Sequence, residues 1–136
     1  MSRAVLVIGG VLILFGAVCH AQEETAVTVD TMEFCSGIEN RQPVGATSQF
    51  FSEIDKIYCF TRITGATDTM TIQHVWYFGD DEKARVELPV RSRSWRTWSS
   101  KRMVTDWAGV WRVDIVMPDG TVLMNKEFVY KPMVDE

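Results

Sequence analysis

Hydrophobic and polar residues alternate one by one along two stretches in the second half of the chain. The apolar positions are Ala84, Val86, Leu88 and Val90 in the first stretch, and Trp111, Val113 and Ile115 in the second. Successive side chains of a strand point to opposite faces of its sheet, so a period of two predicts strands with one buried face. The intervening residues, such as Arg85 and Glu87, should face solvent.

A hairpin is predicted after the second stretch, at Pro118-Asp119-Gly120. Asp-Gly is among the strongest short hairpin signals, so Val122–Tyr130 is predicted to return as the next strand. Leu123 and Phe128 both look core-facing, although an odd number of residues separates them. A β-bulge near Asn125 would reconcile the two positions, because a bulge adds one residue to one strand.

Other β-rich segments lie closer to the N-terminus. Ile57–Ile63 and Thr71–Phe78 flank the turn-like sequence at 65–68, which predicts a second hairpin. Thr25–Cys35 is rich in Thr and Val and is predicted to open the domain as a strand. Gly37–Gly45 contains turn-forming Asn, Pro and Gly and is predicted to be a loop.

These segments together predict the fold class. About seven short strands with regular turn signals are typical of an all-β fold, and we expect a single antiparallel β-sandwich, immunoglobulin-like in architecture, over residues 22–136. No window of this range has the pattern of a long amphipathic helix, and no linker or internal repeat divides it. The expected core residues are Val86, Leu88, Trp111, Val113, Ile115 and Phe128.

The first 21 residues predict a secretory signal peptide. Arg3 is a short positive region, Ala4–Val18 is an uncharged apolar run, and small residues precede a cleavage point after Ala21. The run is short for a membrane-spanning helix, which needs about 20 residues. We therefore expect a mature protein that starts at Gln22 in the periplasm or outside the cell. It would reach a membrane only if the signal is retained or Cys19 is lipidated.

Composition narrows the function classes. The 136 residues are 46% hydrophobic and 24% charged, which excludes disordered, collagen-like and low-complexity chains. The formal net charge of −4 argues against a dedicated nucleic-acid binder. The sequence shows no nucleophile–base or paired-carboxylate pattern, so we expect no enzymatic activity and no cofactor.

Two cysteines, Cys35 and Cys59, remain after signal removal. In an exported chain an even pair predicts a disulfide, here one that closes a loop of about 25 residues. Two alternatives stay open: a pair of buried free thiols, or a metal site completed by His74. The metal alternative is the weakest, because the mature chain has one histidine and no C-x-x-C spacing, and we expect no metal.

Several short sequences carry a family resemblance. They are Phe34-Cys35, Ile38–Arg41 with Pro43, Phe60-Thr61-Arg62, His74–Tyr77, Val86–Val90, Trp95–Lys101, and Gly109–Val113 with Asp119-Gly120. Together they resemble a bacterial family catalogued as domain of unknown function 2914. The resemblance spans Val27–Val129, and Trp95–Lys101 is its most specific part. It implies a compact β-rich domain in the bacterial envelope and implies no activity.

His74 shares one face of a predicted strand with Ile72, Trp76 and Phe78. Two explanations are open for it. It is either a core histidine satisfied by hydrogen bonds and packed on tryptophan, or a ligand-contacting residue at a groove, since imidazole titrates near neutral pH. A catalytic role would need a nucleophile or a positioned water beside it. We keep His74 as a secondary candidate for partner contact.

The segment 91–102 is the sharpest candidate site. Five of its residues are basic and none is acidic: Arg91, Arg93, Arg96, Lys101 and Arg102. Trp95 and Trp98 lie three residues apart, so on a regular strand they face opposite sides and one should be more exposed. The segment is either a contact surface, since Arg and Trp dominate protein hot spots, or a structural element whose basic residues protect a sheet edge.

We therefore expect a non-enzymatic, exported β-sandwich module that binds an envelope partner, a protein or an anionic polysaccharide. The expected contact residues are Arg93, Trp95, Arg96, Trp98 and Lys101, with His74 in addition. The alternative is a purely structural envelope domain without a ligand site, and an enzyme is the third choice. An exposed basic-aromatic patch would favour binding, whereas two buried tryptophans would favour the structural role.

Overall fold

The computed structural model describes residues 26–133, which form ten strands and one short 3₁₀ turn. The seven long strands are β1 (Thr28–Cys35), β5 (Lys56–Thr64), β6 (Met70–Phe78), β7 (Asp81–Val90), β8 (Ser94–Arg102), β9 (Gly109–Val116) and β10 (Val122–Lys131). Three short strands are β2 (Gly37–Glu39), β3 (Gln42–Val44) and β4 (Gln49–Phe51), and the turn η1 is Thr105–Trp107. Within this described part of the chain, no helix is long and apolar enough to cross a membrane. The predicted signal peptide lies outside the described residues.

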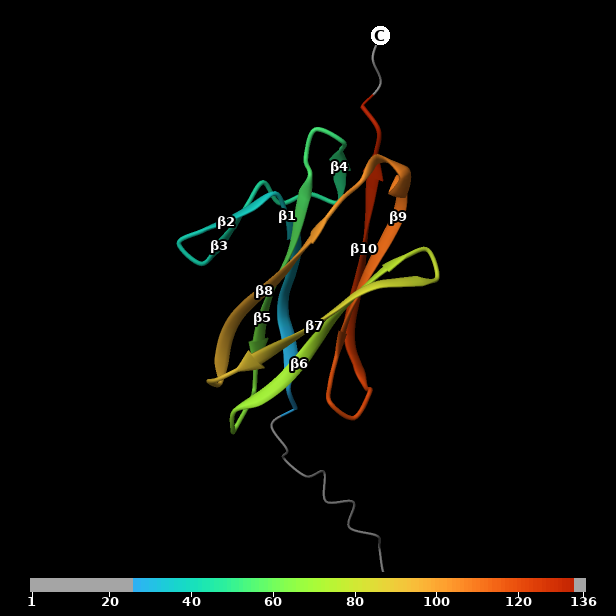
Figure 1. The fold of residues 1–136 in the computed structure, drawn as a ribbon. Helices are drawn as coiled ribbons and strands as arrows, with labels where there is room; N and C mark the ends of the chain where they lie inside the picture. Colours follow the sequence, from blue (N-terminus) through green and yellow to red (C-terminus); the bar gives the residue numbers. More distant parts are fainter. Residues whose placement is uncertain (1–25, 134–136) are drawn as a thin grey trace, which may run out of the picture.

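The long strands form two packed sheets with an immunoglobulin-like topology (Figure 1). One sheet has the order β1-β5-β8 and the other has the order β4-β10-β9-β6-β7. Neighbouring long strands are antiparallel, and the short β4 runs parallel to β10. In chain order, the first, second and fifth long strands face the other four across the core. This arrangement confirms the predicted all-β sandwich.

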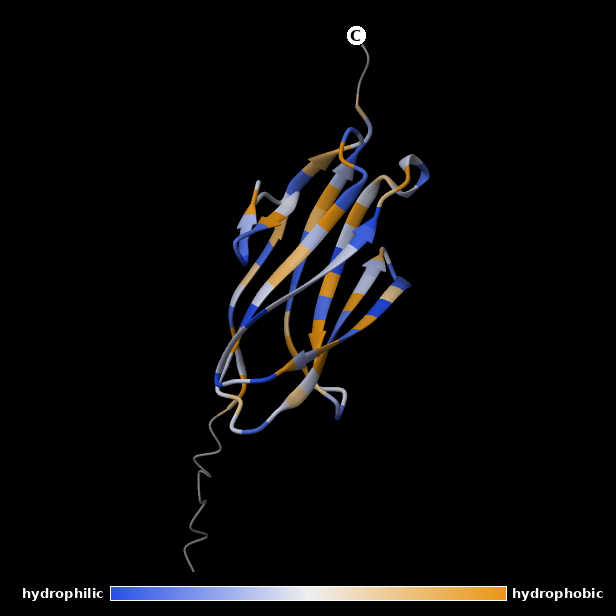
Figure 2. Cartoon of the chain, turned by 60° about the vertical axis from the view of Figure 1, so that its left-hand side comes forward, coloured by the Kyte–Doolittle hydropathy of each residue, from blue (hydrophilic) through white to orange (hydrophobic). Residues whose placement is uncertain are grey.

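The core fills the space between the inner faces of the two sheets. Hydrophobic and hydrophilic residues alternate along the strands, as Figure 2 shows. The ring of Phe128 lies at the centre of an aromatic cluster. Four ring centroids surround it at 4.6 to 6.1 Å and belong to Phe34, Phe50, Trp76 and Trp111. Burial of these large rings is a main source of stability.

The predicted period of two is confirmed, but its two stretches are buried to different degrees. Four of the expected core residues are buried: Trp111, Val113, Ile115 and Phe128. Val86 and Leu88 are only half-buried, although Arg85 and Glu87 beside them are exposed as predicted. The physical reason is that β7 is an edge strand, so its inner face is covered from one side only. The prediction of full burial at Val86 and Leu88 is therefore wrong.

The predicted hairpin between 57–63 and 71–78 is also wrong. β5 pairs with β1 and β8, whereas β6 pairs with β7 and β9, so the chain crosses between the sheets at 65–69. Two strands with one buried face each fit the same sequence pattern whether they pair edge to edge or face each other across a core. The crossing is held at Gly65, whose N–H donates to the Arg93 carbonyl oxygen at 2.9 Å.

Two further local predictions need correction. Residues 37–45 form a small hairpin rather than a loop, because β2 and β3 pair around Asn40-Arg41. Both turn residues have positive φ, 51° and 61°, which is typical of a tight two-residue hairpin turn. This hairpin lies to one side of the β1-β5-β8 sheet (Figure 1). The bulge predicted near Asn125 instead falls at Leu123, where the register between β10 and β9 shifts.

Cys35 and Cys59 are buried free thiols, so the predicted disulfide is wrong. Cys59 lies opposite Phe34 in the β1–β5 ladder, and Cys35 lies opposite Tyr58 one step further on. Consecutive positions of a ladder point to opposite faces, so the sheet separates the two thiols. Burial raises the pKa of both thiols, which disfavours the thiolate that metal binding and disulfide exchange require.

Candidate functional site

The strand β8 presents the two predicted tryptophans on its opposite faces. Arg96 and Trp98 lie on the outer face of the sheet, where the Trp98 ring stacks on Phe60 of β5 with 6.3 Å between centroids. Trp95 is on the inner side and packs against the core. The prediction of opposite faces is therefore confirmed. Both rings are half-buried, so the expected division into one core tryptophan and one more exposed tryptophan is not seen.

Arg41 joins this strand from a distant part of the chain. Its guanidinium carbon lies 5.4 Å from the ring centre of Trp95 and 5.8 Å from that of Trp98. Arg41 Nη2 donates to the Arg96 carbonyl oxygen, and Arg96 Nη1 donates to the Arg41 carbonyl oxygen, both at 3.3 Å. These contacts hold the β2–β3 turn against β8 with a cation–π contact on each tryptophan. Sequence reasoning missed Arg41 because 55 residues separate it from Arg96.

A groove of about 260 Å³ opens along this part of β8 and is called the basic groove below. It is lined by Arg41, Pro89, Arg91, Trp95, Arg96, Thr97 and Trp98. Three guanidinium groups and two indole rings therefore surround one hollow. Arginine binds carboxylate and phosphate through paired hydrogen bonds and also stacks on aromatic rings, so this lining fits an anionic ligand.

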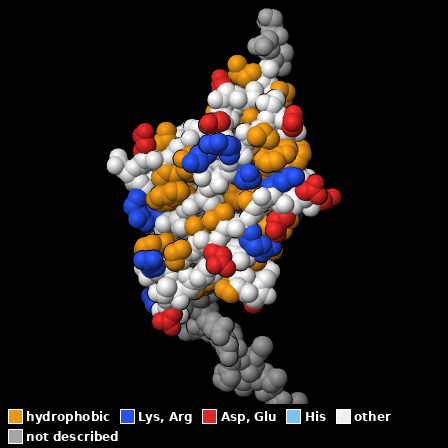
Figure 3. Space-filling view, in the orientation of Figure 1, with side chains coloured by type: hydrophobic (Ala, Val, Ile, Leu, Met, Phe, Trp, Pro, Cys, Tyr) orange, Lys and Arg blue, Asp and Glu red, His pale blue; other side chains and the backbone are white. Residues whose placement is uncertain are grey.

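The guanidinium groups of the basic groove carry uncompensated charge. Among residues 26–133, none of the three has a carboxylate within 4.0 Å. Of the five described arginines outside the groove, three are paired: Arg62 with Asp30 at 3.8 Å, Arg85 with Glu82 at 2.6 Å, and Arg112 with Asp114 at 2.9 Å. The other two, Arg93 and Arg102, have no carboxylate within 4.0 Å among residues 26–133. Figure 3 shows basic and hydrophobic side chains interspersed on one face of the molecule. The groove is thus a locally positive site on a chain of negative net charge.

Three of the six predicted contact residues lie outside the basic groove: Arg93, Lys101 and His74. Arg93 is exposed between β7 and β8, next to the Gly65 crossing. Lys101 lies near the other end of β8, where its Nζ is 4.8 Å from the ring centre of Trp107 and the Nζ of Lys83 is 5.3 Å from the same ring. Burial, together with the charge of Lys83, lowers the pKa of Lys101. The predicted patch is therefore divided into two clusters along β8.

His74 lies in the core and not at a surface. It is 0% exposed, and it does not line the basic groove. A side chain in this position cannot touch a partner, so His74 is removed from the expected contact residues. Of the two explanations left open for His74, the hydrogen-bonded core histidine agrees with its position in the structure.

Two hydroxyl groups of the facing sheet hold the His74 ring. The Thr61 hydroxyl donates its hydrogen to the Thr97 carbonyl oxygen at 2.9 Å. Thr61 Oγ1 has no second hydrogen to donate, so it accepts a hydrogen bond from His74 Nε2 at 3.1 Å. On the other side, Trp76 Nε1 donates to Ser99 Oγ at 3.0 Å, and Ser99 donates to His74 Nδ1 at 2.6 Å. The imidazole is therefore neutral with its proton on Nε2, and both of its nitrogens are satisfied.

Ser99 and His74 have the atom types of a nucleophile and its base, but their setting differs from that of a catalytic pair. Burial lowers the pKa of His74 to about 3, and such a weak base takes a proton from a hydroxyl poorly at neutral pH. Ser99 is 6% exposed, and it does not line the basic groove either. Sequence reasoning could not find this pair, because the partners come from strands of different sheets.

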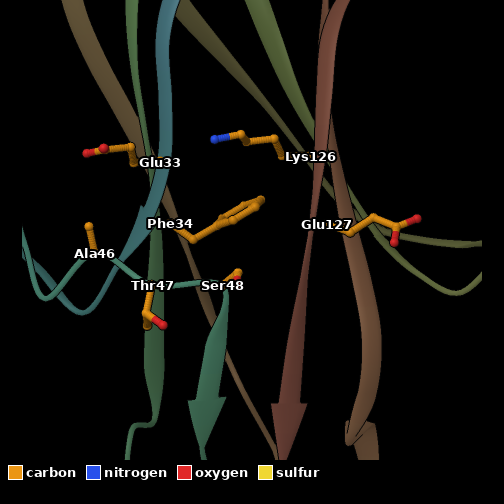
Figure 4. Close-up of a pocket in the computed structure, with 7 residues that line it drawn as sticks. All are labelled: Glu33, Phe34, Ala46, Thr47, Ser48, Lys126 and Glu127. Atoms are coloured by element: carbon orange, nitrogen blue, oxygen red, sulfur yellow. The ribbon is translucent and has the colours of Figure 1, made fainter.

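A second hollow, of about 270 Å³, lies between β1 and β10 (Figure 4). Lys126 reaches toward β1 and donates from Nζ to the Met32 carbonyl oxygen at 2.8 Å. Glu33 and Glu127 also line the hollow, but Figure 4 shows their carboxylates pointing away from Lys126. The charge of Lys126 thus serves to close the sandwich, and this hollow offers less free charge than the basic groove.

No metal-binding cluster of three or more His, Cys, Asp or Glu side chains is present within residues 26–133. Cys35, Cys59 and His74, which formed the metal alternative, do not come together. The two thiols lie on opposite faces of their sheet, and both nitrogens of His74 already bond to hydroxyl groups.

A family model described as Protein of unknown function (DUF2914) matches residues 69–130. The match covers β6 to β10 and includes Trp95–Lys101, the most specific part of the resemblance. It confirms the resemblance over a shorter range than Val27–Val129, and Arg41 lies outside it. No curated protein matches the chain.

Proposed function

We propose that this chain, which belongs to the DUF2914 family over residues 69–130, is an exported, non-enzymatic module that binds an anionic envelope partner through the basic groove. The observation that carries the proposal is the uncompensated charge of Arg41, Arg91 and Arg96 beside two half-buried tryptophans. Arg62, Arg85 and Arg112 elsewhere on the described chain are paired with carboxylates, whereas Arg93 and Arg102 are not, so the distinguishing feature of the groove is that three unpaired guanidinium groups line one hollow. Carboxylates on a polysaccharide or on an acidic protein surface would supply the missing counter-charge.

A purely structural role, the alternative to binding, explains only part of the arrangement of the basic groove. Arg41 and Arg96 fasten the β2–β3 turn to β8 through each other's carbonyl oxygens. That fastening uses one N–H of each guanidinium and leaves the remaining donors free, since each group has five. Arg91 is exposed and takes no part in it. Free donors on three converging guanidinium groups support a binding role in addition to the structural one.

A binding role is also supported over catalysis by the place of the strongly perturbed groups. His74 and Cys59 have the largest pKa shifts, and both are buried in the core. The residues that line the basic groove are cationic, aromatic or uncharged, so they provide contacts for an anion and no general base.

Export rests on the sequence, because the order of Arg3, the apolar run and the small residues before Gln22 is that of a secretory signal. The intact mass of protein recovered from the periplasm or the medium should correspond to a chain that begins at Gln22. A chain that retains Met1 or carries lipid on Cys19 would overturn cleavage after Ala21 and would place the module at a membrane.

Calorimetric titration with polygalacturonate, a linear polymer of carboxylate sugars, tests the binding site, with neutral dextran as the control polymer. We expect binding that weakens as salt is added, because salt screens exposed charges. The double variant R91Q/R96Q should lose about tenfold in affinity or more, since a hydrogen bond to a charged group contributes about 1.5–3 kcal/mol. Thermal unfolding of the same samples separates lost binding from lost folding.

The matched control is K56Q/K131Q, which also removes two positive charges without a carboxylate partner in the described chain, but from exposed positions outside the basic groove. It should bind the polymer as the unchanged protein does. If polygalacturonate does not bind at low salt, or if both double variants lose affinity equally, the groove is not the site. The purely structural role of this edge would then stand.

A further inference from the structure

A second cationic cluster lies at the opposite end of β8 from the basic groove. The Nζ atoms of Lys83 and Lys101 lie 5.3 and 4.8 Å from the ring centre of Trp107, and these three residues are called the lysine cluster below. Among the residues that the structure describes, neither ammonium group has a carboxylate within 4.0 Å. Two like charges beside one ring repel each other, so an anion between or beside them would be stabilised by both.

The lysine cluster and the basic groove share one side of the sandwich, where the edge strands β7 and β8 contact each other. Arg91, directly after β7, lines the groove together with Trp95 at the start of β8. Lys83, near the start of β7, meets Lys101 near the end of β8. The two strands therefore run beside each other in opposite directions. Trp95 and Lys101 are six residues apart, which is about 20 Å on an extended strand.

The stretch between the clusters is lined by side chains without charge. Those that face inward from the two edges are Ala84, Val86 and Leu88 of β7, which are half-buried, and Thr97 and Ser99 of β8, which are buried. Glu87, in the middle of β7, points to the other face of its sheet, where Gln73 Nε2 donates to it at 3.4 Å. Glu82, at the start of β7, is neutralised by Arg85. Positive charge at both ends is thus joined by an uncharged path.

We propose that the basic groove and the lysine cluster are two subsites of one strip that binds a single linear polyanion, a polysaccharide with carboxylates along its length. This inference rests on the proposed function and adds the length and shape of the ligand. A small anion cannot bridge the cations of both clusters, because Arg96 of the groove and Lys101 are five residues apart, about 17 Å on an extended strand. A linear polymer held at one subsite meets the second at a high effective concentration, so its affinity exceeds that of either subsite alone.

An extended polysaccharide suits the strip better than a protein surface does. Protein interfaces usually have a central anchor formed by large side chains that become fully buried. The large hydrophobic residues that are exposed within residues 26–133 are Val44, Phe51, Val104, Val110, Val122, Met124 and Met133. None of them belongs to the basic groove or to the lysine cluster, whose aromatic rings are already covered by cations.

Titration of the mature protein with oligogalacturonates of increasing length, from a disaccharide to a decasaccharide, tests the strip. Affinity should rise steeply once the oligomer spans both clusters, on the order of 10²-fold over the disaccharide. The variant K83Q/K101Q should remove that gain and leave disaccharide affinity unchanged, because the basic groove is intact. The control K56Q/K131Q should keep both the disaccharide affinity and the gain with length.

Each outcome of this series is decisive. If disaccharide and decasaccharide bind equally tightly and R91Q/R96Q abolishes both, the strip is wrong while the proposed function of the groove stands. If no oligomer binds at low salt, the proposed function fails as well. If K83Q/K101Q and the control lose the length-dependent gain equally, the second subsite is elsewhere. Tighter binding of poly-glutamate of matched charge would replace the polysaccharide with an acidic protein partner.

Discussion

Mild acid should destabilise this protein through a single buried side chain. His74 is neutral in the fold with a pKa of about 3, because burial removes the water that would solvate an imidazolium. In the unfolded chain its pKa returns to about 6.5. As the pH falls below 6.5, the unfolded state therefore binds a proton that the folded state excludes. The free energy of unfolding is highest at neutral pH and decreases progressively toward pH 3.

The size of the effect at pH 5 depends on the ordinary pKa and not on the depth of the shift. At pH 5 the histidine is almost fully protonated in the unfolded chain and neutral in the fold, whether its folded pKa is 3 or somewhat lower. Each pH unit below 6.5 costs about 1.36 kcal/mol, so the free energy of unfolding should fall by about 2 kcal/mol between pH 7 and pH 5. Carboxylates add little in this window, since their ordinary pKa values lie near 4.

Urea unfolding followed by tryptophan fluorescence at a series of pH values measures this loss. The reference is the mature protein, in which His74 is the only histidine, and the variant carries His74→Gln. We expect the reference to lose about 2 kcal/mol from pH 7 to pH 5. The variant should be nearly independent of pH in this range, whatever its absolute stability.

Equal pH dependence in the two proteins would refute the reasoning, because the loss would then come from other groups. If His74→Gln does not fold, nitrogen NMR of the reference protein gives a second readout. The His74 ring should carry its proton on Nε2 and should not titrate between pH 7 and pH 5. A ring that titrates near pH 6.5 in the folded protein would contradict the assigned hydrogen-bond chain.

Three further predictions concern the sandwich itself. Leu88→Ala should lower the free energy of unfolding by about 1–2 kcal/mol, because the Leu88 side chain is only half-buried. Ile115→Ala in the closed core should lower it by about 2–5 kcal/mol. Equal losses in urea unfolding would contradict the edge position of β7. Alkylation after denaturation without reductant should modify both Cys35 and Cys59, and a disulfide-linked peptide would contradict the free thiols. Gly65→Ala should lower the melting temperature, because Gly65 has a φ of +92° and an added Cβ would lie 2.5 Å from the Ala26 carbonyl oxygen. Gly79→Ala should lower the melting temperature less, because Gly79 has a positive φ but no atom within 4 Å of an added Cβ.

Local sequence patterns correctly predicted the features that depend on neighbouring residues, namely the alternation along strands and a tight turn. The alternation along β7, β8 and β9 follows from the pleat of a strand, and the turn at Asp119-Gly120 follows from the backbone freedom of glycine. The same patterns could not show that β5 and β6 belong to different sheets, because both strands have one buried face in either arrangement. They also could not place β7 at an edge, which is a property of the whole sheet and decides the half-burial of Leu88.

The candidate site was predictable only where one strand supplies it. The sequence places Trp95, Arg96 and Trp98 on β8 with the correct faces. Arg41 and Trp107 reach β8 from other parts of the chain, so no spacing rule links them to it. The cysteines illustrate the same limitation of sequence reasoning. The expected export and the even number of cysteines predict a disulfide between Cys35 and Cys59, but the register of the β1–β5 ladder places the two thiols on opposite faces of the sheet.

The hydrogen-bond chain through His74 also selects one alignment of the two sheets among several that would bury similar apolar area. A slip of β6 by two residues would keep hydrophobic side chains in the core, but would bring Ile72 or Trp76 to the place of His74, between Thr61 and Ser99. Neither replacement can bond both hydroxyl groups, and a buried polar group without a partner costs about 1–3 kcal/mol. Hydrophobic burial is not directional and separates such neighbouring alignments poorly. One histidine in the core therefore makes misaligned packings less stable than the native one, so it contributes to the uniqueness of the fold.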